Sequence, residues 1–191
     1  MKFLMITGNP KKDGLCKSVE TAIEKGVTEA GAEFETLNTN QFLRCQVCGD
    51  GWGTCREFHV CVLADKDGFD KAQQTIQDAD ALCLITPVYW GEMAEGLKSF
   101  IDRIRRCENF IKGNKGVFAE KPILLVAVPG GSGNGALTCL EQMDRFCRHT
   151  SAVIYDTISV NRWNQDYKRV AVHAAAKAIA SGRQAGATIK G

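Results

Sequence analysis

The sequence predicts a three-layer α/β/α fold built on a five-stranded parallel sheet with the strand order 2-1-3-4-5. Short apolar runs alternate five times with segments whose apolar residues recur at helical spacing. The first, third and fourth runs are strongly apolar, which is typical of strands buried on both faces. The second and fifth runs are mixed and suit the edges of the sheet. Loops rich in glycine, proline or aromatic residues follow the first, third and fourth runs.

Each expected element has a local signal of its own. Gly31 is a typical helix stop before the second strand, Asp67 is a candidate helix cap, and Pro87 ends the third apolar run. The expected strands are residues 3–6, 33–37, 81–86, 123–128 and 153–160. The expected helices contain the apolar positions within residues 19–30, 69–79, 93–104, 137–147 and 167–174.

Length and composition limit the classes of protein to consider. Apolar residues make up 45% of the chain, charged residues 24%, and the net charge is +2, so nothing favours a nucleic-acid partner. No apolar run approaches the ~20 residues of a membrane helix, and the N-terminal segment is interrupted too soon for a signal peptide. We therefore expect a cytoplasmic protein with one domain over residues 1–191 and a cysteine-rich insertion at about residues 44–66.

In such sheets the ligand site lies at the carboxyl ends of the strands, where three loops are expected to meet. The first loop, residues 7–18, leaves a strand and enters a helix, so its backbone N–H groups and the helix dipole favour an anion. A turn that binds nothing is the alternative interpretation. The candidate contacts of this loop are Gly8, Asn9, Pro10, Lys11, Lys12, Gly14, Cys16, Lys17 and Ser18.

The second and third loops have the composition expected around a flat ligand. Tyr89 and Trp90 are adjacent aromatics just after a buried strand, suited to flank a planar ring; packing on neighbouring helices or a dimer contact are the alternatives. The third loop has no large side chains, so a ring can approach its backbone closely. The alternative interpretation is that this loop forms a rim of the site without contacting the ligand. The candidate contacts are Pro87, Val88, Tyr89, Trp90, Gly91, Gly130, Gly131, Ser132 and Gly133.

These loops, together with the segments at residues 79–81 and 97–103, resemble the flavodoxin-like NAD(P)H-dependent FMN reductase and iron-sulfur flavoprotein family. The resemblance implies FMN, with its phosphate in the first loop and its isoalloxazine ring between the second and third. Asn9 and Cys16 replace the serine and threonine that are usual in the family's phosphate loop. Because a thiol is a weaker donor than a hydroxyl, reduced affinity for FMN is expected unless Asn9, Ser18 and the lysines compensate.

Four cysteines, Cys45, Cys48, Cys55 and Cys61, lie where iron-sulfur members of the family carry their ligands. The family spacing is tighter, and residues 49–52 resemble an insertion before the third cysteine. Four thiolates suit a [4Fe-4S] cluster or tetrahedral Zn²⁺, while free thiols or a local disulfide are the alternatives. His59 is expected to be a solvated loop residue rather than a further ligand.

The roles expected for the cysteines outside this segment depend on their places in the predicted strands and helices. Cys83, Cys107, Cys139 and Cys147 are expected to be small core residues, and Cys16 is expected to lie near the phosphate. The basic run Arg103, Arg105, Arg106, Lys112 and Lys115 is interpreted as a solvated helix face, with contact to the phosphate of a nicotinamide nucleotide as the alternative. Asp102 and Arg103 are expected to tie their helix to its neighbours.

The resemblance implies an FMN-dependent oxidoreductase in which NAD(P)H reduces the flavin, which then reduces a quinone, a flavin, another small acceptor or a redox protein. No side chain is assigned as a general acid or base. An iron-sulfur flavoprotein that transfers electrons, or a cofactor-poor thiol redox sensor, are the alternatives. The resemblance also implies a homodimer or homotetramer.

Overall fold

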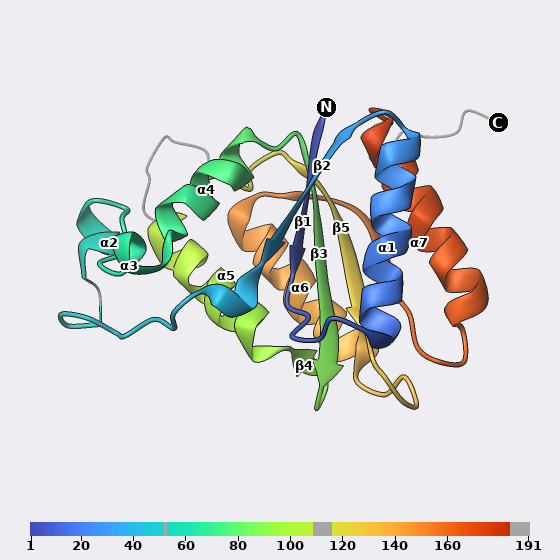
Figure 1. Cartoon of the computed structure of the whole chain (residues 1–191). Coiled ribbons are helices and arrows are strands. Elements are labelled where there is room, and N and C mark those ends of the chain that lie inside the picture. Colours follow the sequence, from blue (N-terminus) through green and yellow to red (C-terminus); the bar gives the residue numbers. More distant parts are fainter. Residues whose placement is uncertain (52, 109–115, 184–191) are drawn as a thin grey trace.

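The computed structural model describes residues 1–51, 53–108 and 116–183. Its parallel sheet has the order β2-β1-β3-β5-β6, which confirms the predicted order of five strands (Figure 1). The parallel strands are β1 (Lys2–Thr7), β2 (Glu33–Asn38), β3 (Ala81–Tyr89), β5 (Pro122–Val128) and β6 (Val153–Ser159).

Helices cover both faces of the sheet (Figure 1). On one face, α1 (Gly14–Glu29) and α7 (Gln165–Ala180) form a core with one set of strand side chains. On the other face, α4 (Phe69–Asp78), α5 (Glu95–Glu108) and α6 (Ala136–Thr150) form a second core. The three central strands are therefore buried on both sides, while β2 and β6 keep exposed positions, as their sequences indicate.

The third strand is longer than its apolar run predicts. Its parallel ladder with β5 continues to the pair Pro87–Val128, so Pro87 does not end it. The end of β3 then pairs antiparallel with a short additional strand, β4 (Glu92–Met93), which the sequence analysis missed. Alternation over so few residues leaves too weak a signal for a strand of this length. The resulting hairpin extends beyond the sheet at its carboxyl edge (Figure 1).

The cysteine-rich segment leaves the sheet after β2 and the short helix η1 (Thr39–Gln41). It contains two short helices, α2 (Thr54–Glu57) and α3 (Ala64–Asp67), and lies beside α4 and α5 at one end of the molecule (Figure 1). Asp67 does support α4, because its Oδ1 accepts a hydrogen bond from Phe69 N at 3.3 Å. Within the described ranges, no helix is both long and apolar enough to cross a membrane.

Candidate functional site

The first loop is fixed by hydrogen bonds from its neighbours at the carboxyl edge. Gly8 N donates to Ile85 O at 2.9 Å, which ties the loop to β3. Asn9 N donates to Thr7 Oγ1 at 3.1 Å, and Lys11 N donates to Asn9 Oδ1 at 3.1 Å. Asn38 Nδ2 donates to Asn9 O at 3.3 Å, so the residue after β1 is held from both sides.

One polar atom in this loop is buried without a partner. Asn9 is only 3% exposed, and its Nδ2 atom makes no hydrogen bond. A buried unsatisfied amide donor costs about 1–3 kcal/mol unless a ligand or water accepts from it. Asn9 belongs to the loop that leads into α1, whose dipole also favours an anion at its start. The loop therefore fits a phosphate group.

The other candidate donors of the loop are arranged differently. The exposed residues Pro10, Lys11, Lys12 and Gly14 lie at the rim, with Gly14 at a φ of +82°. Lys17 Nζ lies 3.4 Å from Glu20 Oε2, and Ser18 Oγ donates to Leu15 O at 2.8 Å, so both side chains already have partners within α1.

Cys16 does not direct its thiol at the loop. Its side chain is buried in the core formed by α1, α7 and the sheet. Burial, and then the nearby carboxylate of Glu20, raise the pKa of this thiol. The Cys16 side chain therefore belongs to the core at the start of α1, and its proximity to a bound phosphate stays a prediction. Position in a loop motif indicated proximity, but the helical turn rotates this side chain inward.

The second loop presents both of its aromatic side chains to solvent. Tyr89 is 48% exposed and Trp90 is completely exposed, so the Trp90 ring is not packed on a neighbouring helix and the Tyr89 ring is about half covered. Trp90 also has a φ of +55°, an uncommon conformation for a residue with a side chain. Pro87 is buried and Val88 is half-buried beneath the hairpin. Two exposed rings at a ligand edge leave ring binding and contact with another subunit as the interpretations.

The second and third loops touch through their glycines. A Cβ atom on Gly135 would lie 2.5 Å from Gly91 Cα, and Gly91 itself has a φ of +82°. Only glycine allows this close backbone approach. At Gly130 a Cβ would meet nothing within 4 Å, while the Cβ of Gly131 would lie 3.9 Å from Arg162 Nη2. The third loop is thus anchored at one end and open at the other.

The remaining predicted residues of the third loop lie between these two ends. Ser132 is exposed, and its Oγ accepts a hydrogen bond from Asn134 N at 3.3 Å. Gly133 has a φ of +85° and approaches Asn161 Nδ2, which would lie 2.6 Å from an added Cβ. The structure therefore brings the three predicted loops to one edge of the sheet (Figure 1).

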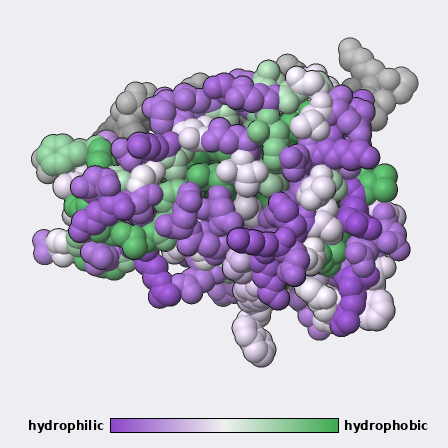
Figure 2. All heavy atoms as spheres, viewed as in Figure 1, coloured by the Kyte–Doolittle hydropathy of each residue, from purple (hydrophilic) through white to green (hydrophobic). Residues whose placement is uncertain are grey.

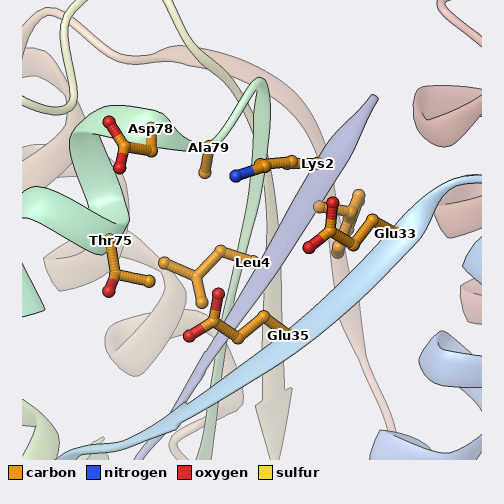
Figure 3. A pocket seen from close by; sticks show the side chains of 8 residues that line it. Lys2, Leu4, Glu33, Glu35, Thr75, Asp78 and Ala79 are labelled. Atoms are coloured by element: carbon orange, nitrogen blue, oxygen red, sulfur yellow. The ribbon is translucent and has the colours of Figure 1, made fainter.

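The opposite edge of the sheet has the wrong charge for a phosphate. A small hollow of about 70 Å³ there is lined by Glu33, Glu35 and Asp78 together with Lys2 (Figure 3). Carboxylates in the lining repel an anion such as a phosphate, and none of the predicted site residues lines this hollow. By contrast, an open hollow of about 550 Å³ beside the hairpin is lined by Tyr89 and Trp90. Size favours a ligand at the carboxyl edge, where this hollow is also lined by charged side chains of both signs: Glu92, Glu95, Asp102, Arg44 and Lys98.

The cysteine-rich segment gathers its four thiols around one small cavity. Cys45, Cys48, Cys55 and Cys61 all line a space of about 20 Å³, and Cys107 from α5 lines it too. All nine cysteines are free. Within residues 1–51, 53–108 and 116–183, no three His, Cys, Asp or Glu side chains are arranged to hold a metal ion. The donor set has the chemistry of an iron-sulfur or zinc site, but the thiols do not close around one point.

A buried ion pair holds this segment against α5. Arg103 and Asp67 have side chains that are 1% and 5% exposed, and they form a salt bridge. Arg103 Nη1 donates to Leu43 O at 2.9 Å, and Leu43 N donates to Asp67 Oδ2 at 2.8 Å. Arg103 Nη2 also lies 3.3 Å from Cys61 Sγ. Although burial opposes it, the hydrogen bond from Arg103 lowers the pKa of Asp67.

Several predictions for this region need correction or confirmation. Arg103 is buried and does not belong to a solvated face, whereas its expected role in tying α5 to its neighbours agrees with its contacts. Lys112 and Lys115 lie outside the described residues, as does the Arg105 side chain. His59 is not simply solvated, because its Nδ1 lies 3.1 Å from Cys107 O.

The core cysteines behave as expected. Cys83, Cys107, Cys139 and Cys147 are buried. Burial raises the pKa of Cys139 and of Cys147 to about 12, so these thiols stay protonated. Burial, followed by the Cys61 and Cys55 sulfurs, raises the pKa of Cys107 to about 12. These four residues act as small hydrophobic side chains.

Fold and loops together define a flavodoxin-like α/β protein with a candidate ligand site at the carboxyl edge of the sheet. The family described as NADPH-dependent FMN reductase matches residues 1–165. The chain belongs to this family. An iron-sulfur flavoprotein of Methanosarcina thermophila is 31% identical over 139 residues, which are 71% of this chain and 66% of the relative. Another from Methanocaldococcus jannaschii is 28% identical over 82% of this chain and 77% of its own length.

The matched segment spans 66% of the Methanosarcina relative and 46% of an iron-sulfur flavoprotein of Archaeoglobus fulgidus, which is 31% identical over 54% of this chain. Solved structures share the fold. An NAD(P)H:quinone oxidoreductase from Methanothermobacter marburgensis has a TM-score of 0.75 at 15% identity, over 94% of this chain and 96% of the other. An azoreductase from Bacillus anthracis has a TM-score of 0.69 at 16% identity, over 95% and 99% of the two chains. At these identities the likeness concerns architecture alone.

Proposed function

We propose that the protein is an FMN-dependent NAD(P)H oxidoreductase that passes reducing equivalents to a quinone, a flavin or another small acceptor. The observation that supports it best is the convergence of three loops at one sheet edge, with the buried, unpartnered Asn9 amide among them. Membership of the FMN reductase family gives the same assignment. The names of several relatives of similar fold, reductases of quinones and azo compounds, favour a small acceptor.

In this proposal each loop has a distinct task. The Asn9 amide and the start of α1 bind the phosphate, with Lys11 and Lys12 adding positive charge at the rim. The bare backbone from Gly130 to Gly133 lies along the ring, and Tyr89 and Trp90 exclude water from it. FMN supplies the hydride chemistry when it is bound, and the protein supplies position and electrostatics.

Titration with FMN tests the proposal directly. We expect the flavin fluorescence to change on addition of micromolar protein, and NADH or NADPH oxidation to require added or bound FMN. A chain that leaves the fluorescence unchanged at high micromolar concentration, and oxidises neither nucleotide, contradicts the proposed activity. The choice of nucleotide follows from comparing kcat/KM for NADH and NADPH with the same acceptor.

A second candidate is electron transfer through a metal centre in the cysteine-rich segment. Four thiols around one cavity favour it, as do relatives named iron-sulfur flavoproteins. Iron, sulfide and zinc analysis of anaerobically purified protein separates a cluster, a zinc site and free thiols. Cys48→Ser should abolish bound metal and leave FMN affinity unchanged, because Cys48 is remote from the three loops in the chain and in the fold. Absence of metal in the wild-type protein excludes this candidate.

Assembly and location follow from the same proposal. Complete exposure of Trp90 at the rim of the site favours a homo-oligomer in which a second copy covers it. Sedimentation analysis of the protein and of Trp90→Ala tests this, and a monomeric wild-type protein contradicts it. Nine free cysteines favour the reducing cytoplasm. Fractionation of cells tests that location, and recovery outside the cytoplasm contradicts it.

A further inference from the structure

A buried polar relay lies beneath the first loop, and the proposed cofactor contacts do not include it. Thr7 and Glu20 are 2% and 4% exposed. Thr7 Oγ1 donates to Glu20 Oε1 at 2.6 Å, and Asn9 N donates to Thr7 Oγ1 at 3.1 Å. A hydroxyl has a single proton, so donating it to the carboxylate directs an oxygen lone pair at the Asn9 N–H. The relay therefore runs in one direction, from the loop through Thr7 to Glu20.

This relay decides which donor of Asn9 is free. The backbone N–H of Asn9 is used by Thr7, and the side-chain Oδ1 is used by Lys11 N. The Nδ2 atom is the buried donor that remains without a partner. With the amide oxygen fixed by a hydrogen bond, the amide nitrogen has a fixed direction as well. The loop thus presents a side-chain N–H where the related motif has a serine hydroxyl.

Two backbone carbonyls of the first loop, those of Thr7 and Asn9, are held by hydrogen bonds away from the proposed phosphate position. Thr39 Oγ1 donates to Thr7 O at 3.1 Å, and Asn38 Nδ2 donates to Asn9 O at 3.3 Å. Asn38 is the last residue of β2 and Thr39 follows it, so these carbonyl oxygens are directed towards the end of that strand. Carbonyl oxygens near an anion are repulsive, and removing two of them improves the site for negative charge.

The charge of Glu20 is compensated locally. A carboxylate buried near a phosphate would lower affinity for the anion through repulsion. Lys17 Nζ lies 3.4 Å from Glu20 Oε2, which places a positive charge between the carboxylate and solvent at the loop side of α1. A buried carboxylate is otherwise costly, so a threonine hydroxyl and a lysine together satisfy it.

We propose that Thr7 and Glu20 are positioning residues that make the site specific for a phosphorylated flavin, by fixing Asn9 so that its side-chain amide donates to the phosphate. This inference rests on the proposed function, because it concerns how the same site tells FMN from riboflavin. A residue that only supports the fold would affect both flavins equally. A residue that positions the phosphate donor affects FMN alone.

Dissociation constants for FMN and riboflavin, measured by fluorescence on the full chain, test the relay. Thr7→Val removes the hydroxyl while keeping the shape, and it should raise the Kd for FMN by about ten- to a hundredfold, as loss of a hydrogen bond to a charged group does. The Kd for riboflavin should change less than twofold. Thr7→Ser keeps the hydroxyl and serves as the matched control, with wild-type preference for FMN. Asn9→Ala should show the same loss as Thr7→Val.

A double-mutant cycle shows whether Thr7 acts through Asn9. In the Asn9→Ala background, Thr7→Val should change the FMN to riboflavin preference less than twofold further. Full additivity of the two effects, or equal loss of both flavins in Thr7→Val, overturns the inference. Thr7→Ala removes the same hydroxyl with a smaller side chain, and it decides the matter if the valine variant does not fold. Failure of the wild-type protein to bind either flavin instead contradicts the proposed function.

Discussion

The loops at the carboxyl edge and the cysteine-rich segment are organised by different forces. The loops continue three buried parallel strands, so the whole sheet fixes where they begin. The cysteine-rich segment leaves the sheet and keeps only short helices of its own, with exposed Val47, Phe58 and Val60 on its surface. Figure 2 shows apolar surface at that end of the molecule. Residues at strand ends are positioned by the packed core, whereas a segment outside the sheet needs separate contacts to hold it in place. We call these contacts a clamp.

That clamp is the buried pair of Arg103 and Asp67, and removing one partner should have the largest effect. Asp67→Asn leaves Arg103 buried without its counter-charge, which costs about 3–5 kcal/mol of unfolding free energy. Chemical denaturation measures the loss. The exposed pair of Lys98 and Asp102 supplies the matched control, since Asp102→Asn should cost less than about 1 kcal/mol. Similar losses in both variants mean that the segment is not held by the clamp.

Glu108, at the end of α5, should make the unfolding free energy of the protein depend on pH. Burial raises the pKa of Glu108 to about 7, although a hydrogen bond from Val117 N opposes the shift. The folded protein therefore holds this proton more tightly than the unfolded chain, and the stability it contributes is lost as pH rises from about 4.5 to about 7. The loss is about 3 kcal/mol, at about 1.4 kcal/mol for each pKa unit.

Glu108→Gln removes this ionisation and keeps the acceptor for Val117 N. We expect its unfolding free energy to fall less than that of the wild type between pH 5 and pH 8, with the difference largest at pH 8. Denaturant titrations at several pH values provide the measurement. Glu24→Gln changes an exposed carboxylate and is the control. If the unfolding free energies of Glu108→Gln and the wild type depend on pH in the same way, then Glu108 does not hold its proton more tightly in the folded state.

At the carboxyl edge the expected effects on stability are smaller and differ between two glycines. A Cβ on Gly8 would lie 2.7 Å from Leu97 Cβ, so Gly8→Ala should cost about 1–3 kcal/mol through overpacking. Gly130 has open space around it, and Gly130→Ala should leave stability within about 0.5 kcal/mol of the wild type. Thermal unfolding distinguishes the two. An equal loss would mean that the open loop is packed against something else.

Much of the sheet was readable from the sequence, because burial on both faces forces continuous apolar runs on β1, β3 and β5. The three loops followed from the strand ends. By contrast, the β4 hairpin is too short for any periodic signal, and Pro87 pairs in a strand that it was expected to end. The error at Arg103 has a similar cause: spacing places a residue on a helix, but packing of distant elements decides whether its side chain meets solvent.

The relay beneath the first loop could not be read in advance for the same reason. Thr7 and Glu20 are separated by a loop and two turns of helix, and an isolated glutamate in an amphipathic helix usually marks its wet face. Only the three-dimensional packing of α1 on the sheet brings the carboxylate beneath Thr7. Once a glutamate is known to be buried, however, its carboxylate must have hydrogen-bond or charge partners nearby.

The contact between Gly91 and Gly135 has a practical consequence for anyone who redesigns this protein. A Cβ on Gly135 would meet the Gly91 backbone, and Gly91 itself has a φ of +82°, so a larger residue at either position would strain the contact between the hairpin and the segment after β5. Libraries aimed at a wider choice of acceptor should therefore leave both glycines fixed and vary Trp90, an exposed side chain that the proposed function places beside the ring.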